Sequence, residues 1–150
     1  MSAAVTLLAR RDFCSSELAA RLSSQGFDQQ AIGSAVEELH DRHYLDDARY
    51  ARQFVTVHAE RGHGPIRIRH DLVALGVSEQ QIDSALAERT DWATQAQTLR
   101  ARRFGAAPPH DWAEKARQVR FLMYRGFSQD DIRSALNTDM DIDMTSDTDT

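Results

Sequence analysis

The sequence predicts an all-α protein of three tandem three-helix repeats with a period of 50 residues, forming an elongated, curved molecule. A ten-residue motif occurs three times, starting at Gly26, Gly76 and Gly126. Four further positions recur at the same offsets: Leu22, Leu72 and Leu122; Ile32, Ile82 and Ile132; Ser34, Ser84 and Ser134; Ala35, Ala85 and Ala135. A composition rich in Ala, Leu, Arg and Gln, with only 3 prolines, also favours helices.

The repeated motif is expected to end one helix and begin the next. Glycine adopts the left-handed conformation without a Cβ clash, so each motif glycine suits the position just after a helix. A ligand-binding loop is the alternative reading of these glycines, but a helix stop explains them without a ligand. Good N-caps follow two residues later, the intervening apolar residue has hydrophobic-staple spacing to the isoleucine, and Gln81 completes a capping box in the second copy. The three expected N-caps are Asp28, Ser78 and Ser128.

Repeat 1 is expected over residues 1–40. Its first helix, over 5–13, turns Leu7 and Leu8 inward. Its second helix is capped by Ser15 or Ser16, and its third helix runs over 28–40.

Repeat 2 is expected over residues 41–89. Asp46 suits the N-cap of its first helix, and Asp47 suits the positive helix end that follows. The helix then buries a stripe at i, i+3, i+4 and i+7, and it ends at Gly62 or Gly64 before Pro65 begins the next helix. The stripe consists of Ala51, Phe54, Val55 and His58.

Repeat 3 is expected over residues 90–138. Its first helix begins near Trp92, ends at Gly105, and uses Leu99 and Phe104 as apolar contacts. The linker Pro108-Pro109 precedes a second helix from about Asp111, and a final helix begins at Ser128. The expected buried side of the second helix is Trp112, Ala116, Val119 and Met123.

The net charge of −5 comes entirely from one segment. Residues 1–138 contain 18 basic and 18 acidic side chains, whereas residues 139–150 contain five aspartates and no cation. This acidic tail is expected to be disordered. Arginine makes up 17 of the 18 cations, which suits recognition of carboxylates and phosphates, although a GC-rich genome would produce the same bias.

No apolar run is long enough to cross a membrane, and no basic segment followed by an apolar run marks a signal peptide. The single Cys14 excludes an internal disulfide and suits a reducing compartment. We therefore expect a cytoplasmic protein.

The residues do not form a recognisable catalytic or metal-binding set. Asp46 and Asp47 are adjacent, but neighbouring side chains on a helix diverge by about 100°. The histidines have no HExxH or CxxC context. The run from Gly62 to Pro65 lacks the preceding strand and the lysine of a phosphate-binding loop. The sequence therefore predicts a non-enzyme without cofactor or metal.

Clustered arginines are the candidate binding residues, because they would face an anionic polymer or protein from one side of the repeat. A solvated surface with local ion pairs is the alternative for any single arginine. The candidates are Arg61, Arg67, Arg69, Arg100, Arg102, Arg103, Arg117, Arg120 and Arg125.

An autonomous tandem helix-turn-helix DNA-binding module is the alternative function. A recognition helix needs cationic or amide side chains for base edges, but residues 28–38 and 78–88 contain no Arg or Lys. Phosphate repulsion would oppose their insertion into a groove.

Three segments of the chain resemble the RecX regulatory family. They are Tyr44-Leu45-Asp46-Asp47-Ala48-Arg49-Tyr50-Ala51-Arg52-Gln53-Phe54-Val55, then Gly62-His63-Gly64-Pro65-Ile66-Arg67-Ile68, then residues 115–128. The resemblance covers roughly residues 5–136, excludes the acidic tail, and departs at His43, where the family usually has glycine.

The resemblance implies a bacterial, cytoplasmic protein without cofactor that binds the RecA filament on single-stranded DNA. It also implies inhibition of the recombinase, ATPase and co-protease activities of RecA, and hence control of homologous recombination, DNA repair and the SOS response. We expect a monomer whose many weak contacts add up along the filament, with at most weak direct contact to DNA. Two hypotheses about this surface follow: reversing Arg67, Arg69, Arg120 and Arg125 to Glu abolishes inhibition, and the acidic tail weakens filament binding by lying over the arginines.

Overall fold

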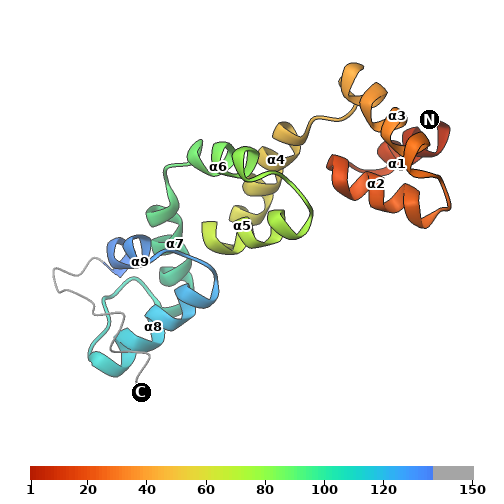
Figure 1. Ribbon diagram of the computed structural model, residues 1–150. Coiled ribbons are helices and arrows are strands. Elements are labelled where there is room, and N and C mark those ends of the chain that lie inside the picture. Colours follow the sequence, from red (N-terminus) through yellow and green to blue (C-terminus); the bar gives the residue numbers. More distant parts are fainter. Residues whose placement is uncertain (137–150) are drawn as a thin grey trace. The chain divides into compact units, whose positions relative to one another are not determined.

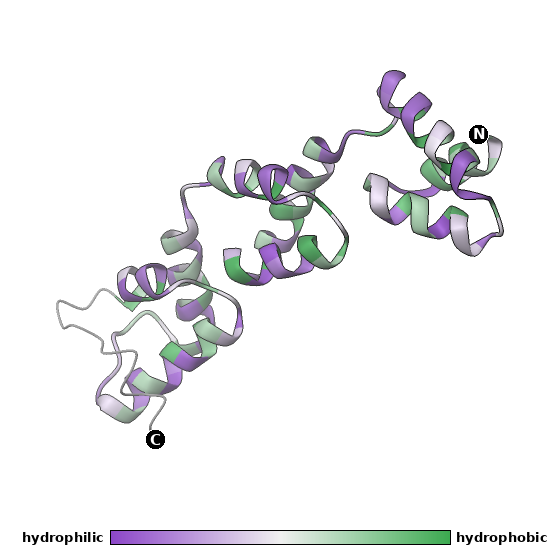
Figure 2. Cartoon of the chain, viewed as in Figure 1, coloured by the Kyte–Doolittle hydropathy of each residue, from purple (hydrophilic) through white to green (hydrophobic). Residues whose placement is uncertain are grey.

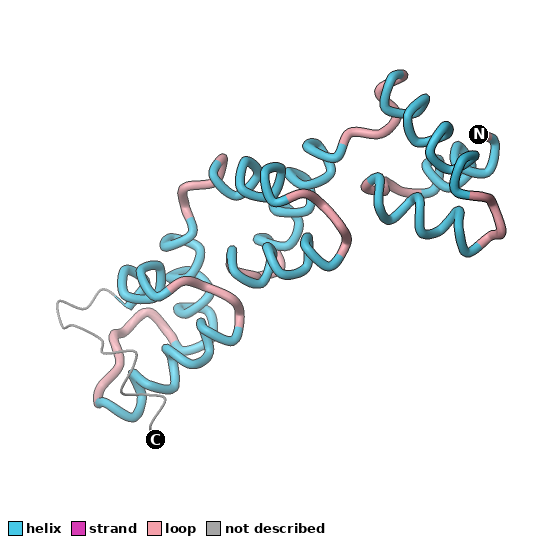
Figure 3. The backbone as a smooth tube through the Cα atoms, viewed as in Figure 1, coloured by secondary structure: helices cyan, strands magenta, loops and turns pink. Residues whose placement is uncertain are grey.

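The computed structural model describes residues 1–136, and these form nine α-helices with no strand among them (Figures 1 and 3). The expected disordered tail, residues 139–150, lies outside the described residues. Every helix carries both hydrophobic and hydrophilic residues (Figure 2). The helices are α1 Ser2–Arg10, α2 Ser15–Ser24, α3 Gln29–Asp41, α4 Asp47–Glu60, α5 Pro65–Ala74, α6 Glu79–Ala87, α7 Trp92–Phe104, α8 Trp112–Tyr124 and α9 Gln129–Leu136.

The glycine motif has the predicted conformation in all three copies. The φ angles of Gly26, Gly76 and Gly126 are +95°, +87° and +95°. In each copy the N–H of the next residue donates to the carbonyl of the motif leucine five residues earlier, at 3.1–3.3 Å. These are Schellman turns, which satisfy carbonyls at the end of a helix.

The predicted N-caps are also present. The side chain of Asp28 accepts a hydrogen bond from the N–H of Ala31, and Ser78 accepts one from Gln81. The hydroxyl of Ser78 also donates to the amide oxygen of Gln81, so this reciprocal contact differs from a standard capping box. Ser128 accepts from the N–H of Asp131.

His43 occupies the same kind of turn without being glycine. Its φ is +64°, its own N–H donates to the carbonyl of His40, and the N–H of Tyr44 donates to that of Leu39. The departure from the family's glycine therefore leaves the turn intact, but with a side chain in the left-handed region, which is unfavourable for most residues.

The described chain divides into two compact units, and the division passes through the second repeat. Unit 1 contains Met1–Val55 and Arg69–Glu88, and unit 2 contains Thr56–Ile68 and the residues from Arg89 onward. In unit 1, α2 packs against α1 and α3 around a core of Ala4, Leu7, Phe13, Leu18, Leu22, Ile32, Leu39 and Leu45. In unit 2, α7 packs against α9 and α8, and α8 also packs against α9.

The same contact between a helix start and a glycine turn occurs in each unit. The start of α2 contacts the turn after α5 in unit 1, and the start of α5 contacts the turn after α8 in unit 2; corresponding residues of the two contacts are about 50 positions apart. In unit 1, Cys14 Sγ donates to the carbonyl of Leu75 and Ser16 Oγ to that of Gly76. In unit 2, the Gly64 N–H donates to the carbonyl of Arg125 at 2.8 Å, and the Ile66 N–H to that of Gly126 at 2.9 Å. Both contacts give a donor to carbonyls at a helix C-terminus.

Three local predictions were wrong: the bounds of the first helix, the capping residue of α2 and the burial of Phe27. The first helix spans Ser2–Arg10 rather than residues 5–13. The residue at the N-cap of α2 is Cys14, without a side-chain cap. The expected caps bind elsewhere: Ser15 forms a hydrogen bond with the ring of His40, and Ser16 donates to the Gly76 carbonyl. The staple residue Phe27 is 43% exposed, whereas its counterparts Val77 and Phe127 are buried.

The buried faces of α7 and α8 also differ from the prediction. Trp112 and Met123 are exposed, because α8 turns the face of Lys115, Val119 and Leu122 into the core. The interior stripe of α7 consists of Trp92, Ala96 and Arg100. Long side chains can bury their apolar stems, and hydropathy alone does not identify such positions.

Candidate arginine-rich binding surface

Most of the candidate arginines belong to unit 2. Arg69 is the exception, since it lies in unit 1 and pairs with Asp83. Arg67 is in unit 2, where its Cβ packs against the Gly126 turn. Three adjoining grooves of unit 2 are lined by the arginine surface, which we define as Arg61, Arg102, Arg103, Arg117, Arg120 and Arg125.

The three grooves share lining residues, so the arginine surface is continuous. Arg103 and Phe121 line both the groove that contains Arg117 and Arg120 and the groove that contains Arg125. Leu99 and Arg102 line the latter groove and also the groove that contains Arg61.

Aromatic rings lie between the guanidinium groups. Arg117 stacks over Phe104 at 5.3 Å, and Arg103 and Arg125 lie over Phe121 at 5.8 and 5.6 Å. The two phenylalanines meet edge to face, with ring centroids 5.4 Å apart. Cation–π contacts of this kind restrict the guanidinium groups while leaving their N–H donors available for a ligand.

Most of the arginine surface has no carboxylate partner. Arg117 pairs with Glu114 at 3.0 Å. The other five members of the arginine surface form no ion pair with any residue that the structure describes. By contrast, six arginines outside this surface do form ion pairs: Arg11, Arg42, Arg52, Arg69, Arg89 and Arg133. Unneutralised cations at close spacing attract an anionic partner.

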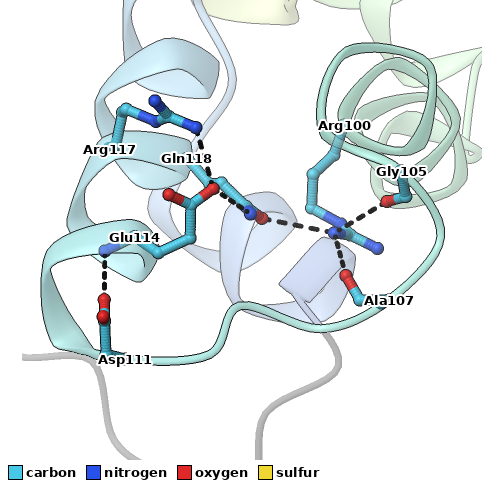
Figure 4. A network of polar contacts seen from close by, with 7 residues as sticks. All are labelled: Arg100, Gly105, Ala107, Asp111, Glu114, Arg117 and Gln118. Atoms are coloured by element: carbon cyan, nitrogen blue, oxygen red, sulfur yellow. Dashed lines mark hydrogen bonds and ion pairs between the residues drawn. The ribbon is translucent and has the colours of Figure 1, made fainter.

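Arg100 is not on this surface, so its expected exposure was wrong. Its side chain is 4% exposed. The guanidinium donates to the carbonyls of Gly105 and Ala107 and to the Oε1 of Gln118 (Figure 4), and it also donates to the carbonyl of Ala106. Among described side chains, only its Nε is buried without a partner. Arg100 therefore holds the α7–α8 loop, and with it the spacing of the two helices that carry most of the arginine surface.

The start of α8 is fixed by a short polar network. Asp111 accepts from the Glu114 N–H at 2.8 Å, and Glu114 accepts from both Arg117 and Gln118 (Figure 4). Gln118 connects this network to Arg100. The network orients Arg117, while Arg120 on the next turn stays unpaired among described residues.

The aromatic lining of the arginine surface was not predicted from the sequence. Phe121 and Tyr124 follow Arg117 and Arg120 at the i, i+3, i+4 and i+7 spacing that places residues on one helix face, so this signal was present. The spacing along α8 does not reveal the contribution of Phe104, because Phe104 belongs to α7. Tyr124 is 82% exposed.

The motif that begins repeat 2 has a structural role in unit 1. Asp46 caps α4 through the N–H of Arg49, and this hydrogen bond lowers the pKa of its carboxyl. Asp47 accepts the Ser15 N–H at 2.8 Å, so it serves the start of α2. Burial raises the pKa of Tyr50 to about 12, and its ring lies 6.2 Å from that of Phe54. Tyr44 is exposed.

The remaining candidate groups are not assembled into a reactive centre in the part of the chain that is described. Cys14 is buried, and desolvation raises the pKa of its thiol. His, Cys, Asp and Glu form no group of three or more that would hold a metal ion within residues 1–136. None of the described helices is long and apolar enough to span a membrane.

These features define a class of protein: an all-α protein of three-helix repeats that presents arginines beside aromatic rings. The models of the first, second and third three-helix domains of RecX match residues 1–39, 46–86 and 91–136. The chain belongs to the RecX family, and the family and the all-α fold of three three-helix domains expected from the sequence are confirmed.

Known relatives agree with this assignment along most of the chain. The regulatory protein RecX of Halorhodospira halophila is 42% identical over 134 residues, covering 89% of this chain and 83% of the relative. That of Vibrio campbellii is 42% identical over 136 residues, covering 90% and 88%. The crystal structure of RecX from Lactobacillus salivarius shares the fold, with a TM-score of 0.81, 24% identity and 91% of each chain covered.

Proposed function

We propose that this protein is a cytoplasmic regulator that binds the RecA filament on single-stranded DNA and inhibits RecA. Membership of the RecX family supports this assignment. In this proposal RecA is the partner, no cofactor takes part, and the recombinase, ATPase and co-protease activities of RecA are all suppressed. The expected monomeric state and elongated arrangement remain predictions, which light scattering and small-angle X-ray scattering can test.

The arginine surface is the observation that carries the proposal. Five of its six members have no carboxylate partner among the described residues, and Phe121 and Phe104 hold three of the six by stacking. Such a surface suits acidic side chains or phosphates, which a filament of protein on DNA presents at regular intervals. Each contact is weak alone, but repeated contacts along a filament add to the overall affinity.

The experiment reverses three charges of the arginine surface together. Arg103→Glu, Arg120→Glu and Arg125→Glu should raise the concentration needed for half-inhibition of RecA ATP hydrolysis by about tenfold or more, which corresponds to about 1.4 kcal/mol of lost binding. The matched control reverses three exposed arginines of unit 1, Arg10, Arg21 and Arg42. Circular dichroism of both variants monitors helicity.

Equal inhibition by the test variant and the wild type would refute the assignment of this surface. Arg69 is better suited as a further control than as a contact, because Asp83 already neutralises it. Arg67 is left out of the test variant, because its Cβ packs against the Gly126 turn and a substitution there would also disturb packing.

The alternative function, an autonomous DNA-binding module, would require cationic side chains on the helices that follow the glycine motifs. The helices after the glycine motifs would have to enter a groove, yet α6 carries Glu79 and Asp83 with no cation, and α9 carries two acids against Arg133. A gel shift with bare single-stranded and duplex DNA, with and without RecA, at two salt concentrations separates the two functions. Binding that requires RecA supports the proposal, and equal binding without RecA supports the alternative.

A further inference from the structure

Positive and negative charges are concentrated in different parts of this chain: arginines on the arginine surface, and aspartates without any cation in residues 139–150. Residues 139–150 contain five of the 23 acidic side chains and no cation. The arginine surface contains six of the 18 cations, and only Arg117 among them has a carboxylate partner in the described residues. An unneutralised cationic surface and an acidic segment without cations thus occur in one molecule, and opposite charges at such local concentration attract.

The acidic segment follows directly in sequence after a helix that packs against the helices of the arginine surface. It follows α9, which ends at Leu136 and packs against both α7 and α8. These two helices carry Arg102, Arg103, Arg117 and Arg120. The fourteen residues from 137 to 150 reach up to about 46–50 Å when extended, whereas α8, with 13 residues, is only about 20 Å long. The segment is therefore long enough to cover the whole groove.

The side chains of the two partners also match in kind. The run Asp139-Met140-Asp141-Ile142-Asp143-Met144 alternates carboxylates with apolar side chains. The groove of Arg103, Arg117 and Arg120 is lined equally by aromatic residues: Phe104, Phe121 and Tyr124. Carboxylates pair with guanidinium groups, and methionine sulfur packs favourably against aromatic rings.

We propose that residues 139–144 bind the arginine surface within the same molecule and act as an autoinhibitory pseudo-ligand. This inference rests on the proposed function for its consequence, because the segment then competes with the RecA filament for the same arginines. A short tether gives an effective concentration on the order of 1 mM. A contact with a dissociation constant of about 0.1–1 mM therefore weakens filament binding by about twofold to tenfold.

The binding step itself is tested without RecA, in the full-length chain. Asp139→Asn, Asp141→Asn and Asp143→Asn remove three charges from the alternating run. Asp12→Asn, Glu37→Gln and Asp41→Asn remove three exposed charges from unit 1 and serve as the matched control. Backbone and arginine Nε–H NMR shifts are compared with those of the wild type at low and high salt.

We expect the tail variant to shift resonances of Arg103, Arg120 and Phe121 while those of α2 and α3 stay in place. The same resonances should move toward the variant's positions when wild type is taken to 1 M salt, where screening acts within about 3 Å. Unchanged α7 and α8 resonances in the tail variant would overturn the inference, and so would equal shifts in the control variant.

The regulatory step is tested by inhibition of RecA ATP hydrolysis. The tail variant should inhibit at about twofold to tenfold lower concentration than wild type at low salt, and this difference should vanish at high salt. If reversal of Arg103, Arg120 and Arg125 abolishes inhibition but the tail variant behaves as wild type, the inference fails and the proposed function stands. If the NMR shifts appear but the reversals leave inhibition intact, the assignment of the arginine surface to filament binding fails and only the intramolecular contact stands.

Discussion

Gly64→Ala offers a sharp test of how the second and third repeats are joined inside unit 2. A Cβ built at Gly64 lies 2.4 Å from the carbonyl carbon and oxygen of Gly126 and 2.5 Å from the N atom of Phe127. These are backbone atoms of a Schellman turn, so they cannot move aside as a flexible side chain would. Because Gly64 is outside the positive-φ region, the effect of alanine comes from this close approach.

The magnitude follows from the contacts that must separate. The hydrogen bonds from Gly64 and Ile66 to the carbonyls of Arg125 and Gly126 contribute about 1 kcal/mol each, and overpacking adds about 1–3 kcal/mol. We expect a loss of about 3–5 kcal/mol, which lowers Tm by roughly 6–20 °C for a chain of this size.

Thermal unfolding followed by circular dichroism measures the stability, and amide hydrogen exchange at Ile66 reports on the contact itself. Gly33→Ala is the control, because a Cβ at this helical position meets nothing within 4 Å and should stabilise by about 0.5–1 kcal/mol. A Gly64→Ala variant that keeps both the wild-type Tm and slow exchange at Ile66 would refute the packing argument.

Three further predictions concern single residues. His43→Gly should stabilise the protein by about 0.5–1 kcal/mol, because it relieves a side chain at positive φ; chemical denaturation measures this, and a loss of stability contradicts it. Arg100→Met should destabilise by about 2–3 kcal/mol and speed amide exchange in the loop after Gly105, since several hydrogen bonds are lost; unchanged loop exchange argues against this role. Asp46→Ala should cost about 1 kcal/mol. Because the folded pKa of Asp46 is lowered, the difference from wild type should be full at neutral pH and shrink below about pH 4, as the carboxyl becomes protonated; a difference that is the same at pH 3 and pH 7 rules this explanation out.

The predictable part of the fold is the part that short-range rules govern. The left-handed turns at Gly26, Gly76 and Gly126 and the cap at Asp28 follow from which residues tolerate a given backbone conformation or accept a nearby N–H. These interactions reach only a few residues along the chain, so the residues themselves specify them.

The less predictable part concerns contacts between elements. The predicted inward face of α8 was wrong because Lys115 and Gln118 are buried there. Gln118 accepts a hydrogen bond from Arg100 of α7, and a long side chain such as lysine can bury its apolar stem. The prediction that Arg100 is exposed was wrong for the same reason: three carbonyls of the following loop surround its guanidinium. Hydropathy counts such side chains as surface residues because it does not include the partners that satisfy them.

The sequence by itself determined the three-helix repeat, its period and the family, since a motif of local turns written three times leaves little freedom in the order of helices. Only the tertiary structure decided which arginines form one surface. Arg103 and Arg117 line one groove from different helices, Arg69 is paired with Asp83, and Arg100 lies inside. Whether a charge is neutralised or free depends on neighbours distant in sequence, because electrostatic attraction acts through space rather than along the chain.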